Sequence, residues 1–355
     1  MNAGWDIMTE AAAVAAPSAS HERVGFSLNR VSVIGVNTLT EAVRQKVFIF
    51  LLVIGLVFIA LAIFFAQYNL GEQEQIKVIK DTCLGVISVI STLIAIVGTA
   101  QLLPSEVENR TIYTILAKPV RRFEFLLGKF YGSVLLLVLS MVAMSLMFGA
   151  VLWIKEQGMI RELSQTYLGE THAATEQANQ QIQQLKITVL DLNLVKAVLA
   201  DLVKAILVAS ITLLVSTFST SLVFNVAVPF MVYIAGMLRG TAVEMWGSHR
   251  LAMAVLAIVP DFGLFSLADD INLGSFVPWA HVSQIIVYGL GRMLIIVVAA
   301  HLIFSRREIQ ANAQQNAEFH ITPGSRAGPV AAGELRPRGA NAVEVRGGSC
   351  FDQTP

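Results

Sequence analysis

The sequence predicts an all-α integral membrane protein with six transmembrane helices. Of its 355 residues, 55% are hydrophobic and only 14% are charged, whereas about a quarter of the residues are charged in a typical soluble domain. The mean hydropathy of +0.66 is also typical of a chain with several membrane spans. Several charge-free apolar runs are long enough, at about 1.5 Å of rise per residue, to cross a hydrocarbon core of about 30 Å.

The predicted spans follow these apolar runs. The charge-free stretch 205–238 is too long for a single crossing, and its polar segment 216–221 indicates a turn that divides it in two. Six crossings place both termini on the same side of the membrane. The six predicted spans are residues 47–66, 82–103, 130–154, 195–218, 222–238 and 279–304.

Basic side chains gather at one set of span ends, which indicates the cytoplasmic side. They precede the first predicted span, fill the link between the second and third spans, and follow the last span as Arg306 and Arg307. The loops on the opposite side mix basic with acidic residues. We therefore expect a multi-pass protein of a bacterial inner (cytoplasmic) membrane with both termini in the cytoplasm. The leader 1–29 and the tail 305–355 are expected to be disordered, because the tail lacks hydrophobic periodicity and the leader, which does not fit a signal peptide, is interrupted by charge and proline.

An amphipathic helix over residues 30–46 is expected to lie on the cytoplasmic membrane surface. Thr38 and Glu41 fit a capping box, and the segment ends with the charged residues Glu41, Arg44 and Lys46. The alternative is that this segment only extends the first span. The apolar side chains at helical spacing are Val33, Val36, Leu39 and Val43.

Two further segments are predicted not to cross the membrane. Residues 155–195 form an external loop, which is expected to be helical and is too polar for the bilayer. Residues 240–278 contain an apolar piece at 251–260, which is too short to span but long enough to enter the membrane and return. We expect a re-entrant segment there, before the last span.

The sequence contains none of the short motifs that would give this chain its own hydrolytic chemistry. Gly128 and Lys129 lack the earlier glycine and the following hydroxyl of a phosphate-binding loop. Neither the H-E-x-x-H nor the G-x-S-x-G pattern occurs. We therefore expect no catalytic residue and no bound cofactor, so that any use of ATP and Mg must occur in a partner protein.

The most informative segment is a short charged link between the second and third predicted spans. Its helical part after Thr111 is apolar on one side and is broken by Pro119, so a soluble motor bound there could push on two spans at once. The alternative is an ordinary cytoplasmic loop whose basic residues only fix the topology. The residues expected to couple to an ATPase are Glu106, Glu108, Arg110, Thr111, Lys118, Pro119, Arg121 and Arg122.

This link resembles the coupling region of type-2 ATP-binding-cassette (ABC) exporter permeases, and in particular the branch that includes permeases linked to multicopper-enzyme maturation. The resemblance rests on the pattern that runs from Glu108, Arg110 and Thr111 through Lys118 and Pro119 to Gly128-Lys129. The run Thr40-Glu41-Ala42-x-Arg44-x-Lys46 is similar to the interfacial helix of that family. Together with the six spans, the resemblance covers roughly residues 30–309.

The resemblance implies a permease subunit of an ABC exporter. Two such subunits, identical or different, would sit in the bilayer on two cytoplasmic ATPase subunits, which use ATP and Mg. No nucleic-acid partner is expected. The long loop 155–195 and the tail depart from the family, so a substrate cannot be carried over. The alternative function is a membrane scaffold or assembly factor with the same architecture and no transported solute.

Charged residues fall inside two of the predicted spans. Arg292 lies near the centre of the last span, where a charge is costly, and could line the translocation path or form a structural ion pair with Asp201, Asp261 or Asp270. Asp201 and Lys204 are placed at the outer end of the fourth span, close enough in sequence to pair. An interfacial pair is favoured over a proton relay.

No metal site is predicted. Met141, Met144 and Met147 form a stripe that could bind Cu(I), but methionine is more often filler between helices, and no Cys or His stands at ligand spacing beside it. The two cysteines, Cys83 at an expected membrane edge and Cys350 in the tail, are not expected to pair.

Overall fold

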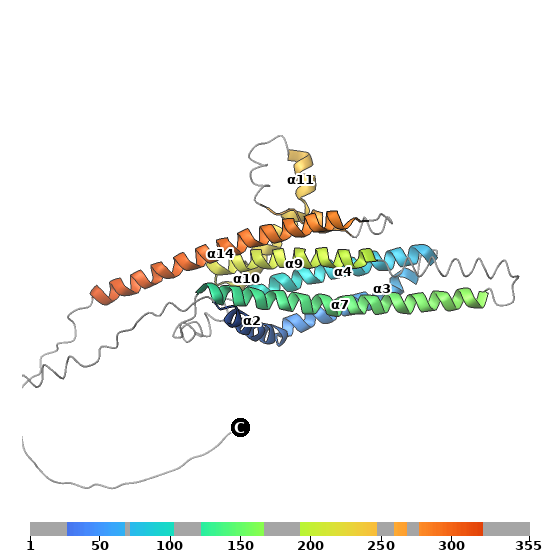
Figure 1. The fold of residues 1–355 in the computed structure, drawn as a ribbon, viewed down its shortest axis with the longest axis horizontal. Coiled ribbons are helices and arrows are strands. Elements are labelled where there is room, and N and C mark those ends of the chain that lie inside the picture. Colours follow the sequence, from blue (N-terminus) through green and yellow to red (C-terminus); the bar gives the residue numbers. More distant parts are fainter. Residues whose placement is uncertain are drawn as a thin grey trace, which may run out of the picture. The chain divides into compact units, whose positions relative to one another are not determined.

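The computed structural model describes residues 27–67, 72–102, 122–166, 192–246, 259–267 and 277–321. The chain divides into two compact units, Met1–Arg307 and Glu308–Pro355. Within the described ranges the regular structure is entirely helical, which confirms the predicted fold class. The elements, labelled in Figure 1, are α2 (Leu28–Val43), α3 (Lys46–Gln67), α4 (Glu72–Ala100), α7 (Arg122–Thr166), α9 (Leu192–Phe218), α10 (Leu222–Met237), α11 (Arg239–Trp246), η1 (Gly263–Phe265) and α14 (Trp279–Ile321).

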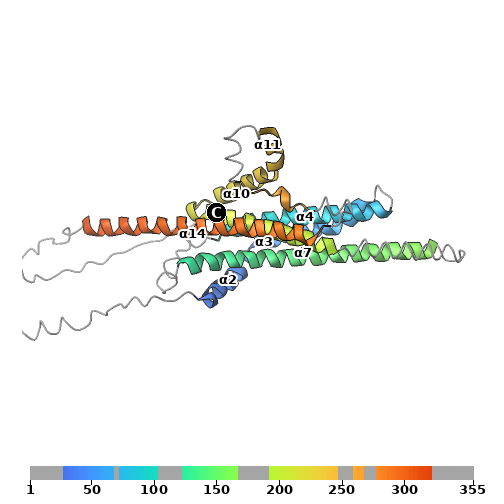
Figure 2. The same cartoon turned by 45° about the horizontal axis from the view of Figure 1, so that its top comes forward.

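Among the described residues, five helices are long and apolar enough to cross a membrane: α3, α4, α7, α9 and α14. A sixth crossing is possible if α10 and α11 count as one span, since the two helices meet at an angle of 57°. Figure 2 shows α11 turned away from the direction of the long helices. The protein is therefore a multi-pass membrane protein with five or six candidate spans.

Several predicted spans agree closely with the helices and others are longer. The candidate span Trp279–Phe304 coincides with the last predicted span. Helix α4 begins ten residues before the predicted 82, and α7 begins at Arg122 instead of 130. These extensions contain charged residues that a search for charge-free runs excludes. As a result Cys83, expected at a membrane edge, is buried inside α4.

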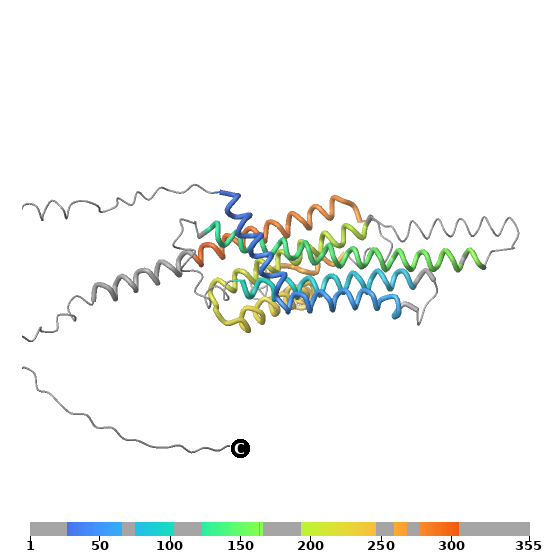
Figure 3. The backbone as a smooth tube through the Cα atoms, turned by 90° about the horizontal axis from the view of Figure 1, so that it is seen from below, coloured from blue at the N-terminus to red at the C-terminus, as the bar shows by residue number. Residues whose placement is uncertain are grey.

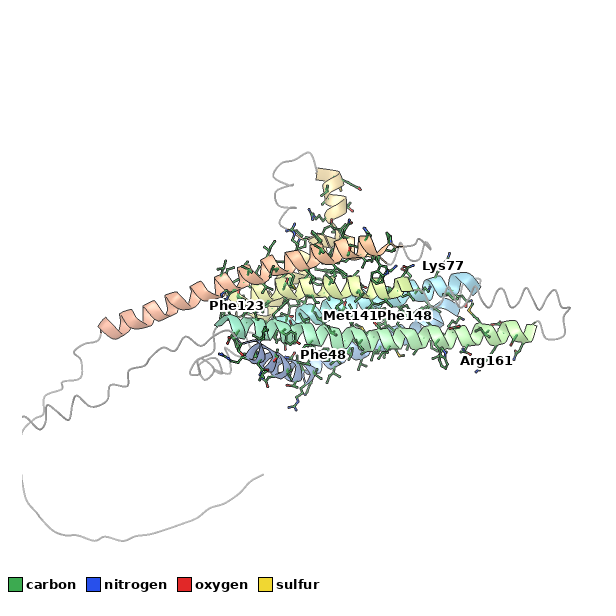
Figure 4. The ribbon with its side chains drawn as sticks, in the orientation of Figure 1. Phe48, Lys77, Phe123, Met141, Phe148 and Arg161 are labelled. Carbon is green, nitrogen blue, oxygen red and sulfur yellow. The ribbon has the colours of Figure 1, made fainter. Side chains whose placement is uncertain are left out.

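The core of the first unit is built on α4 and α9. Both helices have 67% of their apolar span buried, against 22% for α3 and α14. Helices α4 and α9 lie side by side, with α3 and α7 packed on α4 (Figure 3). On α7, Met141 and Phe148 are buried (Figure 4). Met141 and Met144 belong to the hydrophobic core, as filler between helices does, and the described residues contain no His, Cys, Asp and Glu group that could hold a metal ion.

The segment 259–267 packs against α10 and α14. The backbone N–H of Phe262 donates to the carbonyl of Gly236 at the end of α10, over 3.2 Å. The ring of Phe265 lies against Tyr288 of α14, with 6.2 Å between the ring centroids. Phe262 and Phe265 are fully buried, so this segment is anchored in the bundle by two aromatic side chains. The apolar piece predicted to enter the membrane, 251–260, lies outside the described residues except for its last two positions.

One expectation about the N-terminal helix, its capping box, is wrong. Helix α2 starts at Leu28, so Thr38 and Glu41 lie inside it and form no capping box; the Thr38 hydroxyl instead donates to the carbonyl of Ile34. Val33 and Val36, two of the apolar side chains at helical spacing, do not pack against the protein and are exposed. The side chains that face the protein are mostly small, because a helix packs close to its neighbour through small residues: Val31, Gly35, Thr38 and Ala42.

Helix α14 continues beyond the predicted last span to Ile321, where the sequence predicts a disordered tail. The added residues are rich in Ala, Gln, Glu and Arg, which favour a helix even without an apolar face. From Glu308 onwards the helix belongs to the second unit.

Candidate coupling site around the start of α7

The predicted coupling residues Glu106, Glu108, Arg110, Thr111, Lys118, Pro119 and Arg121 lie outside the described residues. The structure does describe what flanks them. Helix α4 ends at Ala100 and α7 begins at Arg122, the last of the predicted coupling residues. Helices α4 and α7 also pack on each other. This link, which we call the hinge segment (residues 104–122), therefore joins two helices that pack on each other.

Helix α2 crosses the first turns of α7 at very short range. A Cβ atom at position 132 would lie 2.6 Å from the Cβ of Thr38 and 2.7 Å from the carbonyl oxygen of Gly35. A Cβ at position 128 would lie 2.7 Å from the Cβ of Ile34. Only glycine fits at both places. The Gly128-x-x-x-Gly132 pair is the small-residue spacing that lets two helices in a membrane approach closely.

An ion pair fastens the start of this crossing. Glu124, in the first turn of α7, has no exposed side-chain area, and its Oε2 lies 3.3 Å from Nη1 of Arg30. Its other oxygen accepts the backbone N–H of Ser27 over 2.9 Å. Both oxygens of the buried carboxylate are therefore satisfied by α2 and the residue before it, which is the condition for keeping a charge buried. The sequence alone does not single out Glu124, because it is one of several charged residues in and directly after the hinge segment.

A second charge pair lies further along the crossing. Nζ of Lys129, which is 2% exposed, stands 3.7 Å from Oε2 of Glu41. The Glu41 side chain is 46% exposed, so this pair contributes less than a buried one. The two predicted basic residues of this region, Arg44 and Lys46, are exposed at the junction of α2 and α3. Of the three residues predicted for the interfacial helix, Glu41 is thus the one brought against α7.

The start of α7 also touches the last span. The ring of Phe123 packs edge-on against His301 of α14, with 4.8 Å between the ring centroids (Figure 4 labels Phe123). Three features at the start of α7 therefore contact two other elements: Phe123 contacts α14, and Glu124 and the two glycines contact the start and the middle of α2. We call residues 122–132 the α7 hub.

Arg292 lies within α14, where the sequence places it. Its guanidinium carbon is 5.7 Å from the centroid of the Tyr288 ring, a cation–π arrangement. The Tyr288 hydroxyl accepts the backbone N–H of Asp261 over 3.0 Å. Arg292 is thus linked through Tyr288 to the segment 259–267. Of the predicted ion-pair partners, Asp201 pairs with Lys204 and Asp270 lies outside the described residues.

The pairing predicted for Asp201 and Lys204 is confirmed, with 2.5 Å between Oδ1 and Nζ. Their predicted position at the outer end of the span is wrong. Helix α9 starts at Leu192, so the pair lies near the middle of the helix, and both side chains are buried. The prediction failed because the charge-free stretch begins only at residue 205, so that in the sequence both charges stand just before the apolar run.

The comparison with known families decides what kind of protein this is. The model of the ABC-2 family transporter proteins matches residues 34–309, which is most of the chain. The chain belongs to the ABC-2 transporter family. No curated protein matches it. An ABC-2 protein is the membrane component of an ABC transporter and normally works with a cytoplasmic ATPase. The match is to the family as a whole, and the branch linked to multicopper-enzyme maturation stays a prediction.

The matched range begins inside α2 and ends just after the last candidate span. In this ABC-2 protein it therefore includes the α2–α7 crossing and the charge pair between Glu41 and Lys129. The sequence shows Gly128 and Gly132 four residues apart. Their role depends on which helix approaches them, and only the fold determines that helix.

Proposed function

We propose that this ABC-2 protein is the permease subunit of an exporter, in which a separate cytoplasmic ATPase grips the hinge segment and drives substrate across a bacterial inner membrane. The observation that carries the proposal is the α7 hub. Directly after the hinge segment, one short stretch of helix is fixed to α2 and α14 by a buried ion pair, a glycine crossing and an aromatic contact. A displacement of the hinge segment would therefore move α7 together with α2 and α14.

The same proposal assigns the ATP chemistry to the partner. The permease contributes the charged surface, and its own residues bind no nucleotide. Two permease subunits, identical or different, and two ATPase subunits form the transporter, with both permease termini in the cytoplasm. The substrate class is left open, since nothing in the described bundle selects among lipids, peptides, sugars and metal-related cargo.

Replacing Glu108 and Arg110 together by alanine is expected to uncouple the ATPase. These side chains carry opposite charges two positions apart in the sequence, so their loss removes polar contacts without adding bulk. The measurement is the ATPase activity of the co-purified complex in proteoliposomes, relative to the ATPase alone. We expect the permease-dependent part of that activity to fall about tenfold, while the amount of inserted permease stays constant.

A topology measurement controls this experiment. A cysteine at position 109, in a background with Cys83 and Cys350 replaced by serine, should react with a membrane-impermeant maleimide only from the cytoplasmic side. A cysteine at position 177, in the predicted external loop, should react from the opposite side. Labelling of position 109 from outside would refute the proposed docking surface. Purification without any ATPase would favour the scaffold function instead.

Replacing Arg292 by leucine is expected to abolish transport while insertion stays normal. The charge lies within the span and connects α14 through Tyr288 to the segment 259–267. The measurement is the ATP-dependent uptake of cell-derived solutes into inside-out vesicles, detected by mass spectrometry. Arg292→Lys keeps the cation over the ring and should retain part of the uptake. Full uptake by Arg292→Leu would remove this residue from the transport path.

A further inference from the structure

Lys204 is a charged side chain at the middle of a membrane-spanning bundle. The candidate spans of α4 and α9 run from Gln75 to Ala100 and from Asn193 to Phe218. With about 1.5 Å of rise per residue, Lys204 lies roughly 15–20 Å from either end of its span. Its side chain is 2% exposed. A charge at this depth is rare and costly, so its presence needs a reason.

The ammonium group of Lys204 connects two helices. It pairs with Asp201, one turn earlier on α9, and it donates to Oγ of Ser88 on α4. Ser88 is also near the middle of its own helix. The ion pair therefore neutralises the charge within α9, and the additional bond to Ser88 ties α9 to α4 at one defined height.

Several other hydroxyls of these two helices form hydrogen bonds within their own helix. Ser91 and Thr92 on α4 donate to the carbonyl of Ser88 on their own helix. On α9, three hydroxyls also donate to carbonyls three or four residues earlier: Ser210, Thr212 and Ser216. Bonds within one helix define no register between the two helices, whereas the Lys204–Ser88 bond does.

The helices that Lys204 joins have different connections. Helix α4 leads into the hinge segment, two residues beyond Leu102. Helix α9 meets η1 and α14 at the residue next to Lys204: a Cβ at Gly289 of α14 would lie 2.4 Å from Cγ1 of Val203 and 3.1 Å from the Phe265 ring. The Lys204–Ser88 bond thus connects α4, which leads into the hinge segment, to α9, which contacts η1 and α14.

We propose that Lys204 is a positioning residue for transport: with Asp201 and Ser88 it sets the axial register of α4 against α9 at mid-membrane. Its link to transport rests on the exporter function proposed above. A buried ion pair is weak evidence for stability, since apolar residues of similar size often replace it without loss, but it can specify one register among several. Apolar replacement therefore separates a positioning role from a purely structural one.

The test uses the full-length protein in lipid nanodiscs with Cys350 replaced by serine. Spin labels on cysteines introduced at the exposed positions 89 on α4 and 199 on α9 report the distance between the two helices by double electron–electron resonance. The native Cys83 is buried and stays in place. The variants are Lys204→Met/Asp201→Leu, which removes both charges, and Ser88→Ala, which removes only the tie to α4. Lys77→Met, an exposed lysine on α4, is the control.

We expect both variants to give a broadened or shifted distance distribution, and Lys77→Met to match the wild type. In the complex with its ATPase, the permease-dependent activity should fall about tenfold in the double variant even if its thermal unfolding midpoint is unchanged. A narrow, wild-type distribution in Ser88→Ala overturns the proposal, as does wild-type activity of a stable double variant. The distance measurement needs no ATPase, so it decides the register even if the exporter function fails.

Discussion

Replacing Gly132 by leucine will separate α2 from the start of α7. Already the first added carbon would stand 2.7 Å from the backbone carbonyl oxygen of Gly35, which cannot move aside as a flexible side chain could. Overpacking of this kind costs about 1–3 kcal/mol, and here it acts at the crossing that joins α2 to the α7 hub. We expect rapid amide exchange throughout α2 and loss of the permease-dependent ATPase activity.

The measurement is hydrogen–deuterium exchange over residues 28–43, compared between variants in nanodiscs. Gly149→Leu is the matched control: it lies on the same helix, and no described atom lies within 4 Å of its added Cβ. Gly132→Ala should fall between the wild type and Gly132→Leu. If Gly132→Leu exchanges as slowly as the wild type, α2 is not held by this crossing.

Replacing Gly236 by valine will displace the segment 259–267 from α10. An added Cβ would lie 2.3 Å from Cδ2 of Phe262 and 2.6 Å from the carbonyl oxygen of Pro260. The displacement also breaks the bond from the Phe262 N–H to the Gly236 carbonyl and withdraws a fully buried ring from its contact with Tyr233. We expect a loss of about 1–3 kcal/mol in stability and a severe loss of transport.

The thermal unfolding midpoint of the detergent-solubilised protein measures the first effect, and ATP-dependent uptake into inside-out vesicles measures the second. Gly240→Val, on α11, is the control, because no described atom lies within 4 Å of its added Cβ. Equal midpoints for Gly236→Val and Gly240→Val would contradict the anchoring of segment 259–267 on α10.

These two glycine contacts explain why sequence reasoning found the spans but not the site around them. A run of apolar residues predicts a span because the bilayer core demands it. Gly132 and Gly236 both lie in apolar runs, and the sequence around them does not predict which segment packs against either glycine. Likewise Glu124 reads as an ordinary charge at a span end, and only its contacts with Arg30 and Ser27 reveal a buried, fully satisfied carboxylate.

The position of Lys204 illustrates the opposite error. Because charge is costly in the bilayer, the sequence alone predicts that Asp201 and Lys204 lie at the membrane edge. Helix α9 begins well before its charge-free part, since Asn193 and Lys196 have partners there: Lys196 donates to Asn193 and to the carbonyl of Val277. Partners from other segments decide whether a polar residue can lie inside a span.

The sequence by itself determined that this chain is all-helical, where most of it crosses the membrane, and that its charged hinge resembles that of ABC exporter permeases. Only the tertiary structure decided which helices form the core. Helices α4 and α14 are similarly apolar, yet 67% of one span and 22% of the other are buried. The reason is that lipid is as apolar as a helix surface. Hydrophobicity therefore places a helix in the membrane, whereas small residues and paired charges determine which helices it packs against.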